Sequence, residues 1–161
     1  MTIYNVSTFK PEQCGIAYWT EDKINYSHNI QPNFRNRVVA VNGFRKKNEY
    51  SDFVDFCIDR DNLEDYITAA KFLNNNPNAK VIEIQHEFGI FGGKEINGKR
   101  IGNYILEFIN NLNKPIVTTC HTAIESPLNE EDVSVFNERK KNLTEILNKS
   151  KKIIAISNTA K

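Results

Sequence analysis

Three short segments of the sequence place ionisable or glycine residues directly after runs of β-branched residues. They are STFKPEQCGIA at 7–17, QHEFGIFGG at 85–93 and CHTAIESP at 120–127. A loop that only connects two elements more often uses Asn, Asp, Ser or Pro. Histidine, glutamate and aromatic side chains on a glycine-containing backbone are what a ligand-facing loop needs. We therefore take these three segments as candidate binding or catalytic loops.

Gly15 and the two histidines of these loops each have a simple and a functional interpretation. Gly15 precedes a helical pattern, where backbone N–H groups and the helix dipole favour an anion, but it is also a permissive residue for a helix start. His86 and His121, taken singly, are most simply buried histidines with satisfied hydrogen bonds. Their coincidence at the ends of two different strands favours a shared site. The fingerprint G-x-G-x-x-G is absent, so NAD or FAD is not indicated.

Metal and thiol chemistry are the alternatives at the same positions. A metal would need a third ligand beside the two histidines, and Glu87, Cys120 and Glu125 are available. No H-E-x-x-H pattern is present, so we predict no metal. Cys120 next to His121 would fit a thiol nucleophile, yet adjacent residues of a strand point to opposite faces.

The segment GKEINGKR at 93–100 matches the first seven positions of a phosphate-binding P-loop. Its eighth residue is Arg100 rather than Ser or Thr, and it does not directly follow a strand. We therefore expect a mobile polar loop that leads into a helix from Gly102.

The elements that must position these loops follow from short β-branched runs, which indicate strands, and from helical periodicity between them. Strands are predicted at Ile3–Val6, Val38–Val41, Phe53–Ile58, Val81–Gln85, Ile116–Cys120 and Ile153–Ile156. Helical patterns occupy 16–30, 63–73, 105–112 and 136–147. This alternation predicts an α/β fold with a mainly parallel sheet and helices on both faces. The gap before the Phe53 segment is too short for a helical crossover, so that strand is expected to be antiparallel or at an edge.

Parallel strands bring the loops that follow them to one edge of the sheet. If the strand order is 3-2-1-4-5-6, the first and fourth strands flank the point where the winding reverses, which is where ligands bind. The three candidate loops would then line one cleft that contains Gly15, His86 and His121.

Composition sets the remaining limits. At 161 residues the chain is expected to form one domain with a real core. Three widely spaced cysteines indicate neither a disulfide framework nor a zinc ribbon and fit a cytoplasmic protein. The net charge of +1 argues against a nucleic-acid partner. No leader and no transmembrane segment is recognised.

Five segments resemble, in order and at suitable spacing, the N-terminal half of a glycosyltransferase of the GT-B fold, in the large retaining family 4 (group 1). They are STFKPEQCGIAYWTEDK at 7–23, DYITAAKFLN at 65–74, QHEFGIFGG at 85–93, KPIVTTCHTAIESP at 114–127 and KIIAISNTAK at 152–161. The resemblance spans nearly the whole chain, and QHEFGIFGG together with VTTCHT is quite specific.

The resemblance implies an enzyme of two Rossmann-like domains that moves a sugar from a nucleotide-sugar donor to a sugar or lipid-linked acceptor with retention. Residues 1–161 would be the single N-terminal, acceptor-side domain. Gly15 and Ile16 match the glycine loop that reaches the donor diphosphate, and His121 matches a histidine that reaches the transferring sugar. The family segment beside the acceptor is matched by His86, Glu87, Phe88 and Gly89. The nucleotide-sugar is a substrate, and no cofactor is implied.

The C-terminal donor-binding domain of the family has no counterpart in this sequence. The chain is therefore expected to be inactive alone, with the missing half supplied in cis or in trans. Its partner-facing loop, with Phe88, Ile90 and Phe91, is expected to be exposed or mobile. The alternative is a nucleotide- or sugar-binding module of Rossmann-like fold without catalysis.

Overall fold

The computed structural model describes residues 1–42, 49–122 and 130–156, and its centre is a six-stranded parallel sheet. The strands follow the order β3-β2-β1-β4-β7-β8, which is the 3-2-1-4-5-6 order when these six strands are numbered along the chain. They are β1 (Thr2–Ser7), β2 (Arg35–Asn42), β3 (Val54–Asp59), β4 (Ala79–His86), β7 (Ile116–Cys120) and β8 (Lys152–Ala155). The predicted α/β, Rossmann-like fold class is confirmed.

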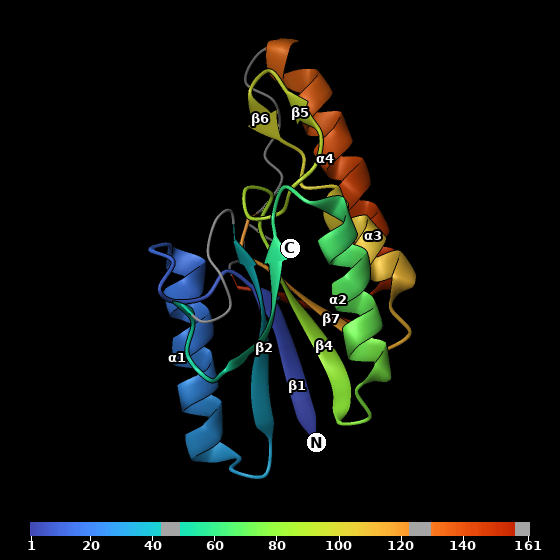
Figure 1. The fold of residues 1–161 in the computed structure, drawn as a ribbon. Helices are drawn as coiled ribbons and strands as arrows, with labels where there is room; N and C mark the ends of the chain where they lie inside the picture. The colour runs from blue at the N-terminus through green and yellow to red at the C-terminus, as the bar shows by residue number, and fades with distance from the viewer. Residues whose placement is uncertain (43–48, 123–129, 157–161) are drawn as a thin grey trace.

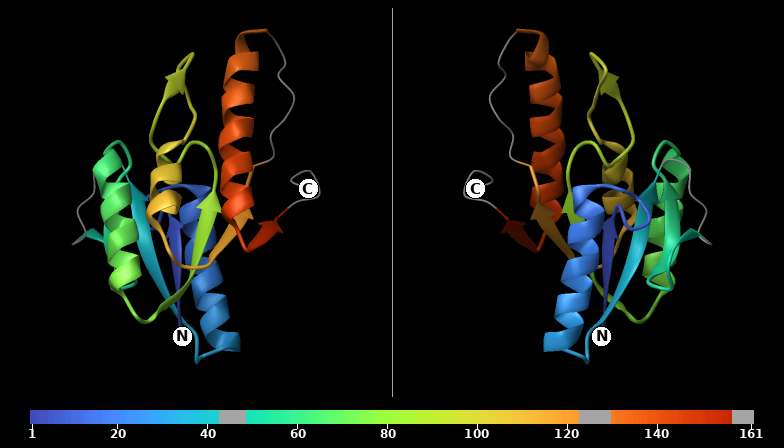
Figure 2. Two further views of the ribbon diagram at one scale, coloured as in Figure 1. Left: turned by 90° about the vertical axis from the view of Figure 1, so that its right-hand side faces the viewer. Right: turned by 90° about the vertical axis from the view of Figure 1, so that its left-hand side faces the viewer.

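Helices cover both faces of this sheet (Figures 1 and 2). They are α1 (Gly15–Ile30), α2 (Leu63–Asn75), α3 (Tyr104–Asn111) and α4 (Glu130–Lys149). The helix α1 lies on one face, while α2, α3 and α4 lie on the other. Each of the four predicted helical stretches falls on one of them. Within the described residues, no helix has the length and apolar character needed to cross a membrane.

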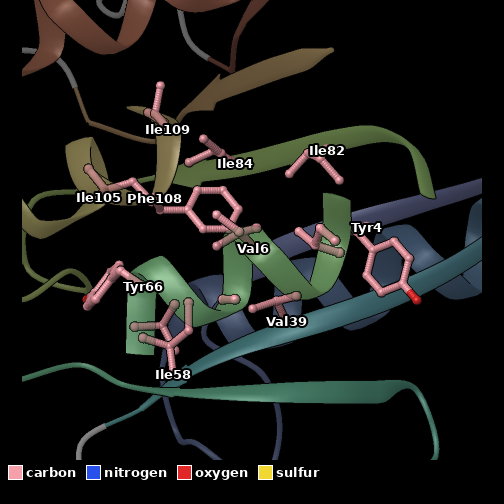
Figure 3. Close-up of a cluster of buried hydrophobic side chains, with 14 of the residues drawn as sticks. Tyr4, Val6, Val39, Ile58, Tyr66, Ile82, Ile84, Ile105, Phe108 and Ile109 are labelled. Carbon is pink, nitrogen blue, oxygen red and sulfur yellow. The ribbon is translucent and has the colours of Figure 1, made fainter. Parts of the chain in front are cut away.

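The main core lies between the sheet and the helices α2 and α3 (Figure 3). Val6, Ile82 and Ile84 extend from the central strands toward Tyr66 of α2 and Phe108 of α3, and all five are 0% exposed. Burying one such apolar side chain contributes roughly 1.5–3 kcal/mol. This layer therefore fixes the central strands whose ends carry the candidate loops.

Strand β3 is at the edge, as expected, but it is parallel rather than antiparallel. It pairs with β2 in the register Val38↔Val54. The connection covers only residues 43–53. This span is close to the dozen residues that a parallel crossover commonly takes, so the short gap did not exclude parallel pairing.

The segment expected to be a mobile polar loop is an antiparallel hairpin of β5 (Glu95–Ile96) and β6 (Lys99–Arg100). Asn97 and Gly98 at its turn have φ of 51° and 70°, which fits the Asn-Gly preference of type I′ turns. Arg139 of α4 donates from Nε and a terminal nitrogen to the Arg100 carbonyl at 2.9 and 2.6 Å. Figure 1 shows this hairpin and α4 extending beyond the carboxyl edge of the sheet.

Candidate functional site

The carboxyl edge of the sheet carries all three positions singled out from the sequence. β1 leads to Gly15 at the first position of α1, β4 ends at His86, and His121 directly follows β7. The backbone joins the two histidines, because the His121 N–H donates to the His86 carbonyl at 3.0 Å. Gly15, His86 and His121 therefore lie at the same edge, on adjacent strands or the helix that follows one.

The start of α1 is an open helix N-terminus. Cys14 is its N-cap, and the Cys14 Sγ accepts a hydrogen bond from the Ala17 N–H at 3.4 Å. The first N–H groups of a helix have no partner within the helix. Gly15 is exposed, and a Cβ added there would meet no atom within 4 Å. The Gly15 and Ile16 amides are thus placed where an anion can approach them.

The imidazole of His121 is half-buried and held on two sides. Its Nε2 lies 2.9 Å from Gln85 Oε1, and the Trp19 ring packs against it edge-on with 4.8 Å between centroids. Burial lowers the pKa of His121 below its ordinary value. The Glu83 carboxylate opposes that shift, and the Lys23 ammonium adds to it. The ring is therefore neutral at neutral pH and is oriented by its neighbours.

Beneath His121 lies a polar network on the α1 side of the sheet. Glu83 of β4, which is 7% exposed, forms an ion pair with Lys23 of α1. Glu83 Oε1 accepts hydrogen bonds from Gln85 Nε2 and Thr119 Oγ1, each at 2.9 Å. Lys23 Nζ also donates to Asn5 Oδ1 at 2.9 Å. Burial lowers the pKa of Lys23, and its pairing with Glu83 opposes this.

These network residues were missed in the sequence reasoning, although a signal for them exists. Side chains alternate between the two faces of a strand. Polar residues recur at alternate positions of three strands that prove to be neighbours, at Asn5 and Ser7, Glu83 and Gln85, and Thr119 and His121. A glutamate in the middle of a buried strand predicts a partner of opposite charge.

His86 is not exposed at this edge. It is 0% exposed, and its ring packs edge-on against Phe88 with centroids 4.8 Å apart. Among the described residues, neither ring nitrogen has a hydrogen-bond partner. Burial, and then the nearby His121, lower the pKa of His86 to about 4. The His86 ring is therefore neutral and lies behind the surface.

The loop that follows β4 is packed, so the expectation that its apolar side chains are exposed is wrong. Phe88 is 2% exposed, Ile90 9% and Phe91 0%. Glu87 Oε2 accepts the Gly89 N–H at 2.8 Å and closes the turn. The reason is that the loop packs onto its own domain: Ile90 and Phe91 join the main core, and the Arg139 guanidinium lies 4.9 Å from the Phe88 ring centroid.

Cys120 does not fit the nucleophile interpretation. It is 4% exposed, and burial raises the pKa of its thiol. The reactive form of cysteine is the thiolate, which such an environment disfavours.

A cavity of about 1000 Å³ opens at the opposite, amino edge of the sheet. Its polar groups bind one another: Tyr4 donates to Asp55 at 2.8 Å, Arg37 pairs with Asp55, and Asn76 donates to the Tyr4 hydroxyl at 2.8 Å. We place the candidate site at the carboxyl edge instead, because the open helix N-terminus and the oriented histidine lie there.

Comparison with solved structures shows a glycosyltransferase-like fold. An α-glucosyltransferase in complex with UDP and a 13-mer DNA containing a central A:G mismatch covers 98% of this chain, with a TM-score of 0.61 and 15% sequence identity. This chain spans 37% of the length of that protein. At this identity the likeness concerns the fold. No protein-family model and no curated protein sequence matches the chain.

Proposed function

We propose that the chain is the N-terminal, acceptor-side domain of a retaining family 4 glycosyltransferase, which moves a sugar from a nucleotide-sugar donor to an acceptor. The observation that carries the proposal is that an oriented His121 and the open N-terminus of α1 lie at the same edge of the sheet. The glycosyltransferase-like fold and the sequence segments that carry the family resemblance support it.

In this proposal the α1 N-terminus stabilises the leaving group. A departing nucleotide diphosphate develops negative charge, and preorganised N–H donors stabilise such charge without reorganisation. Gly15 and Ile16 supply these donors, and the α1 dipole adds to their effect. The role needs neither a metal nor an organic cofactor, because the helix itself supplies the positive potential.

His121 acts at the transferring sugar. Its half-buried ring is fixed by Gln85 and Trp19, so it can meet a sugar hydroxyl in one orientation. A positioned hydrogen bond of this kind favours the reactive geometry of the donor. The acceptor side is assigned to the turn after β4, with Glu87 and exposed Gly89 toward the ligand and His86 and Phe88 beneath them.

The proposal assigns only one wall of the reaction site to residues 1–161. The solved α-glucosyltransferase is much longer than this chain, which corresponds to 37% of its length. We therefore propose that a donor-binding domain, in cis or in trans, completes the site. The 161-residue chain should bind nucleotide-sugars weakly and transfer nothing by itself.

A transfer assay tests this function. In the two-domain enzyme, His121→Ala should lower turnover by about 10²–10³, whereas the lost hydrogen bond to Gln85 should cost about 1–3 kcal/mol of stability and leave the enzyme folded. His28→Ala, at an exposed position near the far end of α1, is the matched control and should leave turnover unchanged. The assay uses a panel of nucleotide-sugars with wild type and both variants.

Unchanged turnover in a folded His121→Ala enzyme would remove this residue from the mechanism. Efficient transfer by residues 1–161 alone would contradict the proposal that a second domain completes the reaction site. Nucleotide-sugar binding without transfer in the two-domain protein would instead favour a binding module.

A further inference from the structure

We propose that Gln85 and Glu83 are positioning residues that hold His121 as the Nε2–H tautomer and leave its Nδ1 to accept a hydrogen bond from a ligand hydroxyl. The proposal rests on the proposed function only for the nature of that ligand, a sugar. The tautomer itself is argued from side-chain contacts within the chain.

The chain of contacts begins at a fixed carboxylate. Glu83 lies in the centre of the sheet with a side chain 9% exposed, and Lys23 pairs with it from α1. Thr119 donates to its Oε1 at 2.9 Å from the neighbouring strand. A buried carboxylate with an ammonium partner and a hydroxyl donor is charged and acts as an acceptor only.

Glu83 fixes the orientation of the Gln85 side-chain amide. Gln85 is 0% exposed, and its Nε2 donates to Glu83 Oε1 at 2.9 Å. The opposite orientation of the amide would bring its oxygen against the carboxylate, where two acceptors would face each other in a buried site. The Gln85 oxygen is therefore the atom that faces His121.

The orientation of Gln85 determines the tautomer of His121. Gln85 Oε1 can only accept, and His121 Nε2 lies 2.9 Å from it, so Nε2 carries the proton. In a neutral imidazole the other nitrogen is then an acceptor. The Trp19 ring, edge-on at 4.8 Å, restricts rotation of the imidazole. His121 Nδ1 is therefore available to accept a hydrogen bond from a ligand hydroxyl and cannot donate one.

Charged and titratable groups around His121 are consistent with a neutral ring. Glu83 faces it from β4 and Lys23 from α1, and these two act on its pKa in opposite directions. His86, on β4, is neutral at the pH of the experiment below. Burial is the largest influence on the His121 pKa and lowers it despite the opposing Glu83 carboxylate, so the imidazole is uncharged near neutral pH.

Nitrogen-15 NMR of the 161-residue chain tests the proposal near neutral pH. Two-bond proton–nitrogen spectra of the imidazoles, assigned with a His121→Asn variant, should show His121 with a protonated Nε2 and an unprotonated Nδ1. A slowly exchanging, hydrogen-bonded Nε2–H resonance should accompany this pattern. In Gln85→Met the acceptor is lost, so this resonance should disappear through exchange with water.

Two further variants separate positioning from general stability. Thr119→Val removes the other 2.9 Å hydrogen bond to Glu83 Oε1 but leaves Gln85 and His121 in contact. It should preserve the His121 resonance. Glu83→Gln retains the size of the side chain but allows the oxygen and nitrogen of the Gln85 amide to exchange places. It should therefore weaken the His121 Nε2–H resonance. This variant provides a second test should Gln85→Met not fold.

A wild-type His121 with the proton on Nδ1 would overturn the proposal, as would a Nε2–H resonance that survives in both folded Gln85→Met and Glu83→Gln chains. The spectra need no donor or acceptor sugar. Failure of this proposal therefore leaves the transfer assay unaffected, and failure of the transfer assay leaves the tautomer result unaffected.

Discussion

At the scale of single residues, His86 should control part of the pH dependence of stability. Its pKa is about 4 in the folded chain, against an ordinary value of 6.5. Between these values the unfolded chain binds the extra proton and the folded chain does not, so stability falls as pH falls through this window. The slope from one group is at most about 1.4 kcal/mol per pH unit.

His86→Phe removes this titration and also the two ring nitrogens that lack partners among the described residues. We expect the free energy of unfolding of the variant to depend less on pH between 6.5 and 4. At neutral pH it should equal or exceed that of wild type by about 1 kcal/mol, because an apolar ring replaces buried polar atoms.

Urea unfolding at several pH values measures both effects. The control is His28→Phe, which places the same substitution at an exposed position and should retain the part of the pH profile that His86 contributes. The lowered pKa of His121 acts in the same direction as that of His86, and it is present in every variant, so the difference between curves isolates His86. A His86→Phe profile that parallels wild type would contradict the assignment.

At the scale of elements, the absence of a side chain at Gly92 lets the loop after β4 pack closely and hydrogen-bond to α2. A Cβ at Gly92 would lie 1.7 Å from the Arg60 carbonyl oxygen, and the Gly92 N–H donates to the Tyr66 hydroxyl at 2.9 Å. Gly92→Ala should therefore destabilise the chain toward the upper end of the roughly 1–3 kcal/mol that overpacking typically costs. Thermal melting measures the loss.

Gly15→Ala is the matched comparison for Gly92→Ala. The added Cβ meets no atom within 4 Å, and alanine favours a helix over glycine by about 1 kcal/mol at interior positions. Its melting temperature should equal or slightly exceed that of wild type. Equal losses for the two variants would show that steric contact at Gly92 does not hold the loop.

The sequence predicted the elements better than the contacts between them. Short β-branched runs located the six strands of the main sheet, and the 3.6-residue period located the helices because it reports on which face is buried. It did not predict that Phe88 and Phe91 are buried, since a loop has no periodicity to show which side is covered. The Asn97-Gly98 pair is a sequence signal for a hairpin turn, but the partial match of residues 93–100 to a P-loop led to a different prediction.

The candidate site shows the same division. Gly15, His86 and His121 were predicted at one edge because strand order and direction alone determine it. The partners of His121 are Gln85 and, through it, Glu83 and Lys23, which lie far apart along the chain. Such pairings depend on the register between strands, which one sequence does not specify.

At the scale of the whole molecule, the two edges of the sheet are competing places for a ligand. The amino edge has the cavity of about 1000 Å³, while the carboxyl edge has an open helix N-terminus and an oriented histidine. Cavity volume alone would choose the former. We place the ligand at the carboxyl edge, because polar groups at the amino edge, such as Tyr4 and Asp55, hydrogen-bond to each other.

Backbone amide NMR during a titration with UDP decides between the two edges and tests the central claim most directly. Our account predicts weak binding, with chemical-shift changes concentrated at the Gly15 and Ile16 amides and at His121, and with Gly15→Ala reducing them in a chain that remains folded. Changes confined to Tyr4 and Asp55 around the amino-edge cavity, or none at the start of α1, would contradict it.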